Sequence, residues 1–214
     1  MYVNSSDILR IFEMLNNNKV KYVLLRNINN ELPNNFKANK DIDILVHPSS
    51  KEKLHNLLKN NGWKKIKHPL DNGLDFIFLY NMDKFEMFTK NNINLDICYQ
   101  LSCRSLNRRE WIPIDQKIND SVWINRKINN IYNWYEMSDE DQLIHLLTRC
   151  VFDKKKFEDG YVNEIDRLLG FTKIDNIKQK LELIFFKFTP YLLDLLKSHK
   201  YELIIKNYIQ FKDY

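Results

Sequence analysis

Two aspartates stand one residue apart in the stretch NKDIDILVHP, residues 39–48. Side chains alternate between the two faces of a strand, so Asp41 and Asp43 point to one side and the apolar residues between and after them to the other. Neighbours on one face lie about 6–7 Å apart, from two rises of roughly 3.3 Å. Both carboxylates can therefore reach one divalent cation or a pair of them. The same residues also suit a turn and a strand edge in contact with water.

A third carboxylate, Asp96, lies in a run over residues 93–99 in which apolar residues alternate strictly with others. If this run and residues 41–46 are neighbouring strands with their apolar faces buried together, Asp41, Asp43 and Asp96 emerge on the same side. Three carboxylates that close repel one another unless a cation is present. Mg²⁺ accepts a few carboxylates and keeps positions for waters and substrate phosphates. The spacing by itself also allows three solvated carboxylates without a metal.

The residues around the carboxylates predict an α/β arrangement. Helical spacing of apolar residues predicts a helix over residues 6–15, capped by Ser5 or Ser6, and a second helix from Pro48 that Gly62 ends. An Asn-rich loop is predicted over residues 27–40. Strands are predicted at residues 21–26, 41–46, 63–67, 74–80, 85–89 and 93–101.

The predicted secondary structure changes from mixed α/β to helical near Met137. Short β-like runs at residues 121–124 and 131–135 come before it, and Ser138 after it is a suitable N-cap for a helix. Further helices are predicted over residues 161–169, 174–188 and 191–211. We therefore expect an α+β fold: a mixed β-sheet flanked by helices over residues 1–137, followed by an α-helical domain over residues 138–214 that completes a cleft.

The composition excludes several classes of protein. The net charge of +5 is spread along all 214 residues, with no basic tail or arm of the kind typical of a nucleic-acid-binding protein. The three cysteines include no CxxC pair, so neither a disulfide framework nor a structural zinc site is indicated. Apolar stretches are too short and too charged to cross a bilayer, and we expect a cytoplasmic protein.

These segments together resemble the nucleotidyltransferase superfamily. The resemblance rests on TyrValLeuLeuArgAsn at residues 22–27, LysAspIleAspIleLeuVal at residues 40–46 and AsnLeuAspIle at residues 94–97. The chain is similar in particular to bacterial nucleotidyltransferase-like proteins whose first strand ends in Leu-Arg-Asn. The resemblance covers roughly residues 22–100 and implies a nucleotidyltransferase-like mixed sheet.

The resemblance also implies roles for particular residues. Asp41, Asp43 and Asp96 would be the catalytic residues and the ligands of Mg²⁺ or Mn²⁺, and Asp96 would also activate the acceptor. In the superfamily a Gly-Ser pair after the first strand holds the nucleotide phosphates, whereas this chain has Arg26 and Asn27 there. A guanidinium can hold phosphate through paired hydrogen bonds. We expect the nucleotide, such as ATP, to be bound by Arg26, Asn27 and Lys40.

The implied reaction is attack by an acceptor hydroxyl or phosphate on the α-phosphate of an NTP, with pyrophosphate leaving. The acceptor would be a small molecule: a sugar, a sugar phosphate or an antibiotic. Two alternatives stay open. One is a LicD-like phosphotransferase that modifies surface glycans. The other is a nucleotidyltransferase fold without catalytic activity that serves as a binding or antitoxin module.

Other residues in the C-terminal half are candidates for contact with the substrate. His145 lies on an apolar helix, where a histidine is more often part of the core than a catalyst. It is followed by a cluster of charge that can meet a triphosphate or an anionic acceptor, although such runs are usually solvated. These substrate candidates are His145, Arg149, Asp153 and Lys154. Cys98 is interpreted as a packing residue. The stretch over residues 108–111 is interpreted as an exposed loop with one buried tryptophan, Trp111, and stacking on a base or sugar is the alternative.

Overall fold

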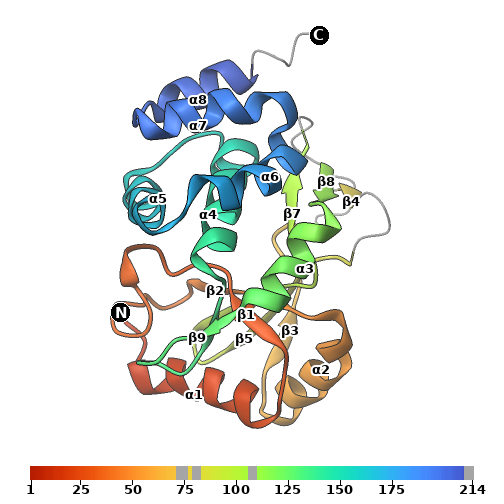
Figure 1. Cartoon of the computed structure of the whole chain (residues 1–214). Coiled ribbons are helices and arrows are strands. Elements are labelled where there is room, and N and C mark those ends of the chain that lie inside the picture. The colour runs from red at the N-terminus through yellow and green to blue at the C-terminus, as the bar shows by residue number, and fades with distance from the viewer. Residues whose placement is uncertain (71–76, 79–82, 106–109, 210–214) are drawn as a thin grey trace.

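The computed structural model describes residues 1–70, 77–78, 83–105 and 110–209 (Figure 1). Within these residues the centre of the molecule is a seven-stranded mixed sheet in the order β3-β5-β6-β2-β1-β10-β9. Its strands are β1 (Tyr22–Leu24), β2 (Asp41–Val46), β3 (Lys64–Ile66), β5 (Glu86–Lys90), β6 (Ile93–Cys98), β9 (Lys127–Ile128) and β10 (Tyr135–Glu136). A smaller sheet contains β4 (Ile77–Phe78), β7 (Ser102–Arg104) and β8 (Glu110–Pro113) in the order β4-β8-β7.

The pairing of β2 with β6 decides how the carboxylates are placed. The two strands run parallel, and Asp43 is the direct partner of Asp96, while Asp41 is opposite Asn94. Strand β1 pairs antiparallel with the other edge of β2. The prediction that residues 41–46 and 93–99 are neighbouring strands is confirmed.

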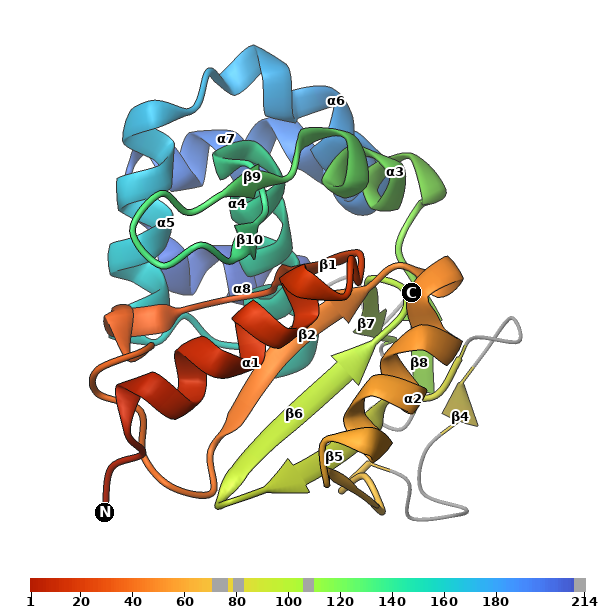
Figure 2. The same ribbon diagram turned by 90° about the horizontal axis from the view of Figure 1, so that it is seen from below.

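One face of the large sheet is covered by α1 (Ser5–Asn17) and α2 (Lys51–Asn60), as Figure 2 shows. Apolar side chains from alternate positions of the strands pack with these helices, among them Tyr22, Ile42 and Ile44. The opposite face carries Val23 and Leu45, which share a core with the C-terminal helices. Since Asp43 alternates with Ile42 and Ile44, its side chain lies on this second face, toward the C-terminal helices.

The C-terminal half is helical (Figure 1). Its elements are α4 (Asp139–Thr148), the π-helix η4 (Arg149–Lys154), α5 (Asp159–Phe171), α6 (Ile174–Phe185), the short 3₁₀ helix η5 (Phe186–Phe188), α7 (Thr189–Lys197) and α8 (Tyr201–Ile209). The predicted cap is confirmed, because the Ser138 hydroxyl accepts a hydrogen bond from the backbone N–H of Asp141 at 3.2 Å. No helix within the described ranges is both long and apolar enough to span a bilayer.

Several predicted elements differ from the structure. Residues 121–124, predicted as a strand, belong to helix α3 (Gln116–Asn125), because Asp115 caps this helix and Ile118 and Val122 are buried one turn apart. Of the predicted strand over residues 131–135, only Tyr135 lies in a strand. The helix predicted over residues 191–211 is two helices, separated at His199, whose φ of 53° is left-handed.

The remaining differences are at the ends of elements. Asn4, rather than Ser5 or Ser6, caps α1, since its side chain accepts from the backbone N–H of Ser6 at 3.0 Å. Of the strand predicted over residues 74–80, Ile77 and Phe78 are in β4, and the other positions lie outside the described residues. Residues 210 and 211 of the last predicted helix also lie outside them.

Candidate active site

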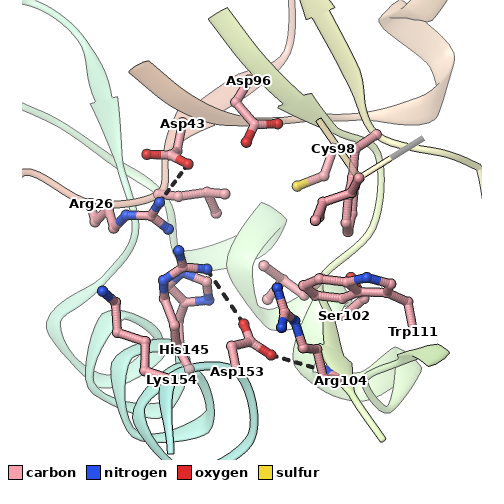
Figure 3. A pocket seen from close by; sticks show the side chains of 15 residues that line it. Arg26, Asp43, Asp96, Cys98, Ser102, Arg104, Trp111, His145, Asp153 and Lys154 are labelled. Carbon is pink, nitrogen blue, oxygen red and sulfur yellow. Dashed lines mark hydrogen bonds and ion pairs between the residues drawn. The ribbon is translucent and has the colours of Figure 1, made fainter. Parts of the chain in front are cut away.

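Asp43 of β2 and Asp96 of β6 face a cavity of about 310 Å³ (Figure 3). Three parts of the chain enclose it: the large sheet, the end of α4 with η4, and the small sheet. In Figure 3, Asp43 and Asp96 lie on one side of the cavity, His145, Asp153 and Lys154 on the opposite side, and Trp111 and Arg104 on a third. The cavity therefore joins segments from residue 25 to residue 154.

Asp43 forms an ion pair with Arg26, whose Nη2 lies 2.6 Å from Oδ1 of the carboxylate. The side chains are only 13% and 17% exposed, respectively. Burial raises the pKa of Asp43 from 3.8 to about 6, and repulsion by Asp96 and Asp41 adds to this rise, while Arg26 and Arg149 oppose it. Burial and repulsion together outweigh the attraction of the guanidinium, so the ionised form of Asp43 is destabilised, and additional positive charge would stabilise it.

Asp96 is held by a histidine. The Nε2 atom of His68 lies 3.2 Å from Oδ1 of Asp96, and the backbone N–H of Leu70 donates to Nδ1 of the same ring at 3.0 Å. Since Nδ1 accepts a hydrogen bond, the ring proton is on Nε2, which donates to the carboxylate. His68 is buried and therefore fixes the direction in which Asp96 points.

Asp41 lies at the open end of the site. Its side chain accepts a hydrogen bond from the amide of Asn94 at 3.2 Å. Burial raises the pKa of Asp41, the amide of Asn94 lowers it, and repulsion from Asp96 raises it further. Asp41 borders a second cavity of about 330 Å³, whereas Asp96 borders the first and Asp43 borders both.

The second cavity contains the residues predicted to bind the nucleotide. Arg26, Asn27 and Lys40 all line it, and Arg26 and Asp43 border both cavities. The side-chain amide of Asn27 accepts from the backbone N–H of Leu32 at 2.8 Å and donates to its carbonyl at 3.1 Å. Asn27 thus shapes the loop after β1. Lys40 forms an ion pair with Glu31, with Nζ 2.7 Å from a carboxylate oxygen.

The four substrate candidates in the helical half all line the first cavity. Burial, with Arg149 and Arg26 nearby, lowers the pKa of His145 to about 3, so its ring is neutral at pH 7. Arg149 pairs with Asp153 at 3.4 Å, and Asp153 also accepts from the backbone N–H of Arg104 at 2.9 Å. Lys154 pairs with Glu158 at 2.9 Å.

The third wall of the cavity is aromatic. Trp111 is buried on β8 and meets Phe85 edge to face, with 4.8 Å between ring centroids. The guanidinium of Arg104 lies over the same indole at 5.3 Å. Cys98 also lines the cavity, but burial raises the pKa of its thiol, which stays protonated and is a poor nucleophile. This agrees with the interpretation of Cys98 as a packing residue.

The carboxylates suit a hard cation, but not as a closed cage. Within the described part of the chain, no three His, Cys, Asp or Glu side chains are grouped closely enough to hold one ion. Mg²⁺ is usually held by one or two carboxylates and completed by waters and substrate phosphates. Asp43 and Asp96, direct partners on parallel strands, supply two such carboxylates facing one cavity. The donor set therefore fits a Mg²⁺ that arrives with a phosphate ligand.

Sequence reasoning did not single out His68, Ser102 or Arg104. It predicted Trp111 in an exposed loop, with stacking on a base or sugar only as an alternative, whereas Trp111 lies in β8 and lines the cavity. His68 lies 28 residues before Asp96, with β4 and β5 between them, and no spacing pattern joins the two residues. Trp111 and Arg104 reach the cavity because β7 and β8 form a small sheet beside the large one. Residues 110–113, Glu-Trp-Ile-Pro, show no alternation of polar and apolar residues that would have predicted this strand.

Residues 5–176 match the model of a family described as uncharacterised nucleotidyltransferase. The match extends beyond the first 100 residues through α4, η4 and α5, and so includes both sides of the cavity. No curated protein matches the chain.

The solved structures that are similar to this chain include the following three. The antibiotic-resistance factor ANT(2'')-Ia in complex with adenylyl-2''-tobramycin has a TM-score of 0.50 at 7% identity, over 82% of this chain and 93% of that one. A solution structure of ANT(2'')-Ia has a TM-score of 0.49 at 9% identity, over 92% and 96%. The lincomycin-bound lincosamide antibiotic adenylyltransferase LnuA has a TM-score of 0.47 at 16% identity, over 80% and 100%. At these identities the likeness concerns the fold alone.

Proposed function

The chain belongs to the family of uncharacterised nucleotidyltransferases, and we propose that it transfers a nucleoside monophosphate from an NTP to a small acceptor, with Mg²⁺ or Mn²⁺ and release of pyrophosphate. The acceptor is a sugar, a sugar phosphate or an antibiotic, attacked through a hydroxyl or phosphate oxygen. A structure of similar fold is in complex with an adenylylated antibiotic, which supports including hydroxylated antibiotics among the acceptors to be tested.

The observation that carries this proposal is the wall shared by two cavities. Cavities of about 310 and 330 Å³ meet at Arg26 and Asp43. A transferase needs two substrates whose reacting atoms lie side by side, and each cavity is at the lower end of the range typical of small-molecule sites. We assign the nucleotide to the cavity bordered by Lys40 and the loop after β1. The acceptor then occupies the cavity that contains Asp96 and Trp111.

In the proposed reaction an acceptor oxygen attacks the α-phosphorus, a new P–O bond forms, and the bond to the bridging oxygen of pyrophosphate breaks. Asp96, on the acceptor side, takes the proton of the hydroxyl, while His68 keeps this carboxylate in position. The cation, when bound by Asp43 and Asp96, would neutralise charge on the phosphates. Arg26 and Arg149 add fixed positive charge beside the group that is transferred.

His145 has a different role in this scheme. Its neutral ring has one donor and one acceptor nitrogen, which suits a hydroxyl of the acceptor. A protonated ring would instead attract the phosphates. The low pKa therefore supports our assignment of His145 to the acceptor rather than to the triphosphate.

The test is product formation from each of four NTPs labelled in the α-phosphate, with Mg²⁺ or Mn²⁺ and a panel of sugars, sugar phosphates and hydroxylated antibiotics. We expect the mass of one acceptor to increase by a nucleoside monophosphate, with pyrophosphate released. Asp43→Asn and Asp96→Asn should both abolish this product, whereas Asp194→Asn, at an exposed position on α7, should not. An added phospho-alcohol would indicate a phosphotransferase instead. A protein that binds no NTP in the presence of either metal would contradict the proposal.

A further inference from the structure

Arg26 forms an ion pair with Oδ1 of Asp43, the carboxylate to which the proposed cation would bind. Its Nη2 atom lies 2.6 Å from Oδ1 of Asp43, which is close for a charge-assisted hydrogen bond. A divalent cation beside the same carboxylate would be repelled by the guanidinium at short range. The cation and Arg26 are therefore competitors for Asp43.

The backbone holds both residues close together. The N–H of Leu25 donates to the carbonyl of Asp43 at 2.9 Å, which extends the β1–β2 pairing beyond the last strand residue. Arg26 follows directly, so its Cα is fixed against the sheet. A change of partner by Arg26 consequently needs only a rotation of its long side chain.

Arg26 also has a second place to bind. Its side chain borders both cavities that meet at Asp43, including the one assigned to the nucleotide. A guanidinium binds phosphate through two parallel hydrogen bonds, and a phosphate brings more negative charge than one carboxylate. An arriving triphosphate is thus a suitable new partner for Arg26.

We propose that Arg26 changes partner when the nucleotide binds: without nucleotide it neutralises Asp43, and with nucleotide it binds a phosphate and leaves Asp43 to the divalent cation. This inference rests on the proposed nucleotidyl transfer. It makes the binding of nucleotide and of cation mutually reinforcing. The nucleotide draws Arg26 away from Asp43, where it repels the cation, and the cation takes over Asp43, which competes with the phosphates for Arg26. It also gives the chain a resting state in which the carboxylate has a positive partner without any metal.

The first arm of the test measures Mn²⁺ binding without nucleotide, from the electron paramagnetic resonance signal of the free ion. Arg26→Gln removes the competitor, and we expect it to bind Mn²⁺ on the order of ten- to a hundredfold more tightly than the unmodified protein. Arg10→Gln is the matched control, because Arg10 is an exposed arginine on α1. It removes the same charge and should leave the Kd for Mn²⁺ unchanged. Adding Asp43→Asn to Arg26→Gln should abolish the gain.

The second arm measures ATP binding in EDTA by calorimetry. Arg26→Gln should weaken it by tenfold or more, because the phosphate loses its guanidinium, and Arg10→Gln should not. Arg26→Lys keeps the positive charge but not the paired hydrogen bonds of a guanidinium. Its Kd values for Mn²⁺ and for ATP should therefore lie between those of the unmodified protein and those of Arg26→Gln. This variant also serves if Arg26→Gln does not fold, which circular dichroism would show.

The outcomes separate this inference from the proposed function. If the unmodified protein binds Mn²⁺ and ATP, but the Arg26 variants bind Mn²⁺ no more tightly or ATP no more weakly, the change of partner is overturned and nucleotidyl transfer still stands. If neither ligand binds to any variant or to the unmodified protein, the proposed function fails, and this inference with it.

Discussion

Replacing Asp43 by Asn should make the metal-free protein more stable while removing its proposed activity. Asn has nearly the same shape, and its amide oxygen can still accept a hydrogen bond from Arg26. What it lacks is the negative charge, which is unfavourable here because the side chain is buried and faces Asp96 and Asp41. The site thus carries an electrostatic cost that Arg26 and Arg149 offset only in part and that a bound cation would offset further.

The size of this effect follows from the pKa. A rise from 3.8 to about 6 is about two units, each worth 1.36 kcal/mol, which gives up to about 3 kcal/mol at pH 7. The folded protein holds the Asp43 proton more tightly than the unfolded chain does. The stability due to the protonated group is therefore complete below pH 3.8 and is lost as the pH rises through about 6. The amide introduced by Asp43→Asn cannot titrate, so the advantage of the variant should appear over this window.

The assay is thermal unfolding in EDTA between pH 4 and pH 8. For a chain of this size 3 kcal/mol corresponds to a rise in Tm of about 6–12 °C, expected at pH 7 and absent near pH 4. Asp194→Asn, at an exposed position on α7, is the control and should change neither value. With Mg²⁺ and ATP the order should reverse, because only the unmodified protein gains stability from the ligands. A variant that melts at or below the unmodified protein at pH 7, or one whose advantage persists at pH 4, would refute the reasoning.

Three further changes test other parts of the structure. Trp111→Ala removes the aromatic wall packed against Phe85 and should raise the KM for the acceptor about tenfold while leaving the KM for the NTP unchanged. Trp111→Phe should have a smaller effect, and equal changes in both KM values would count against the assignment of the two cavities to acceptor and nucleotide. Lys180→Met leaves the fully buried carboxylate of Asp141 without its 2.8 Å ion pair and should lower the free energy of unfolding by about 3–5 kcal/mol in denaturant titration, whereas Lys180→Arg should preserve most of it. Gly160→Ala places a Cβ 2.8 Å from Cγ2 of Ile28 in the loop after β1 and should destabilise the protein by about 1–3 kcal/mol. In the same helix, the Cβ of Gly170→Ala meets nothing within 4 Å, so this variant should be neutral or stabilising by about 1 kcal/mol. Similar melting temperatures for the two variants would contradict the contact between residue 160 and Ile28.

Local patterns in the sequence were sufficient to predict a structural feature where that feature depends on a single segment of the chain. The alternation in residues 41–46 and 93–98 identified two strands and the faces of their carboxylates, because the side-chain period of a strand is two whatever surrounds it. The cap at Ser138 depends on its own side chain and the next turn only. By contrast, residues 121–124 resemble a strand by composition and are helical because Ile118 and Val122 pack into a core formed by distant helices.

The sequence alone determined that Asp41 and Asp43 share a face and that Asp96 has the matching alternation, since these follow from backbone geometry. Only the tertiary structure decided that Asp43 is opposite Asp96, that Asp41 borders the second cavity but not the first, and that His68 and Trp111 join the site. The physical reason is that contacts between residues far apart in the chain depend on which strands pair and how the sheets and helices pack. The Arg26 side chain shows both: its place after β1 is visible in the sequence, but its ion pair with Asp43 exists because β1 and β2 lie side by side.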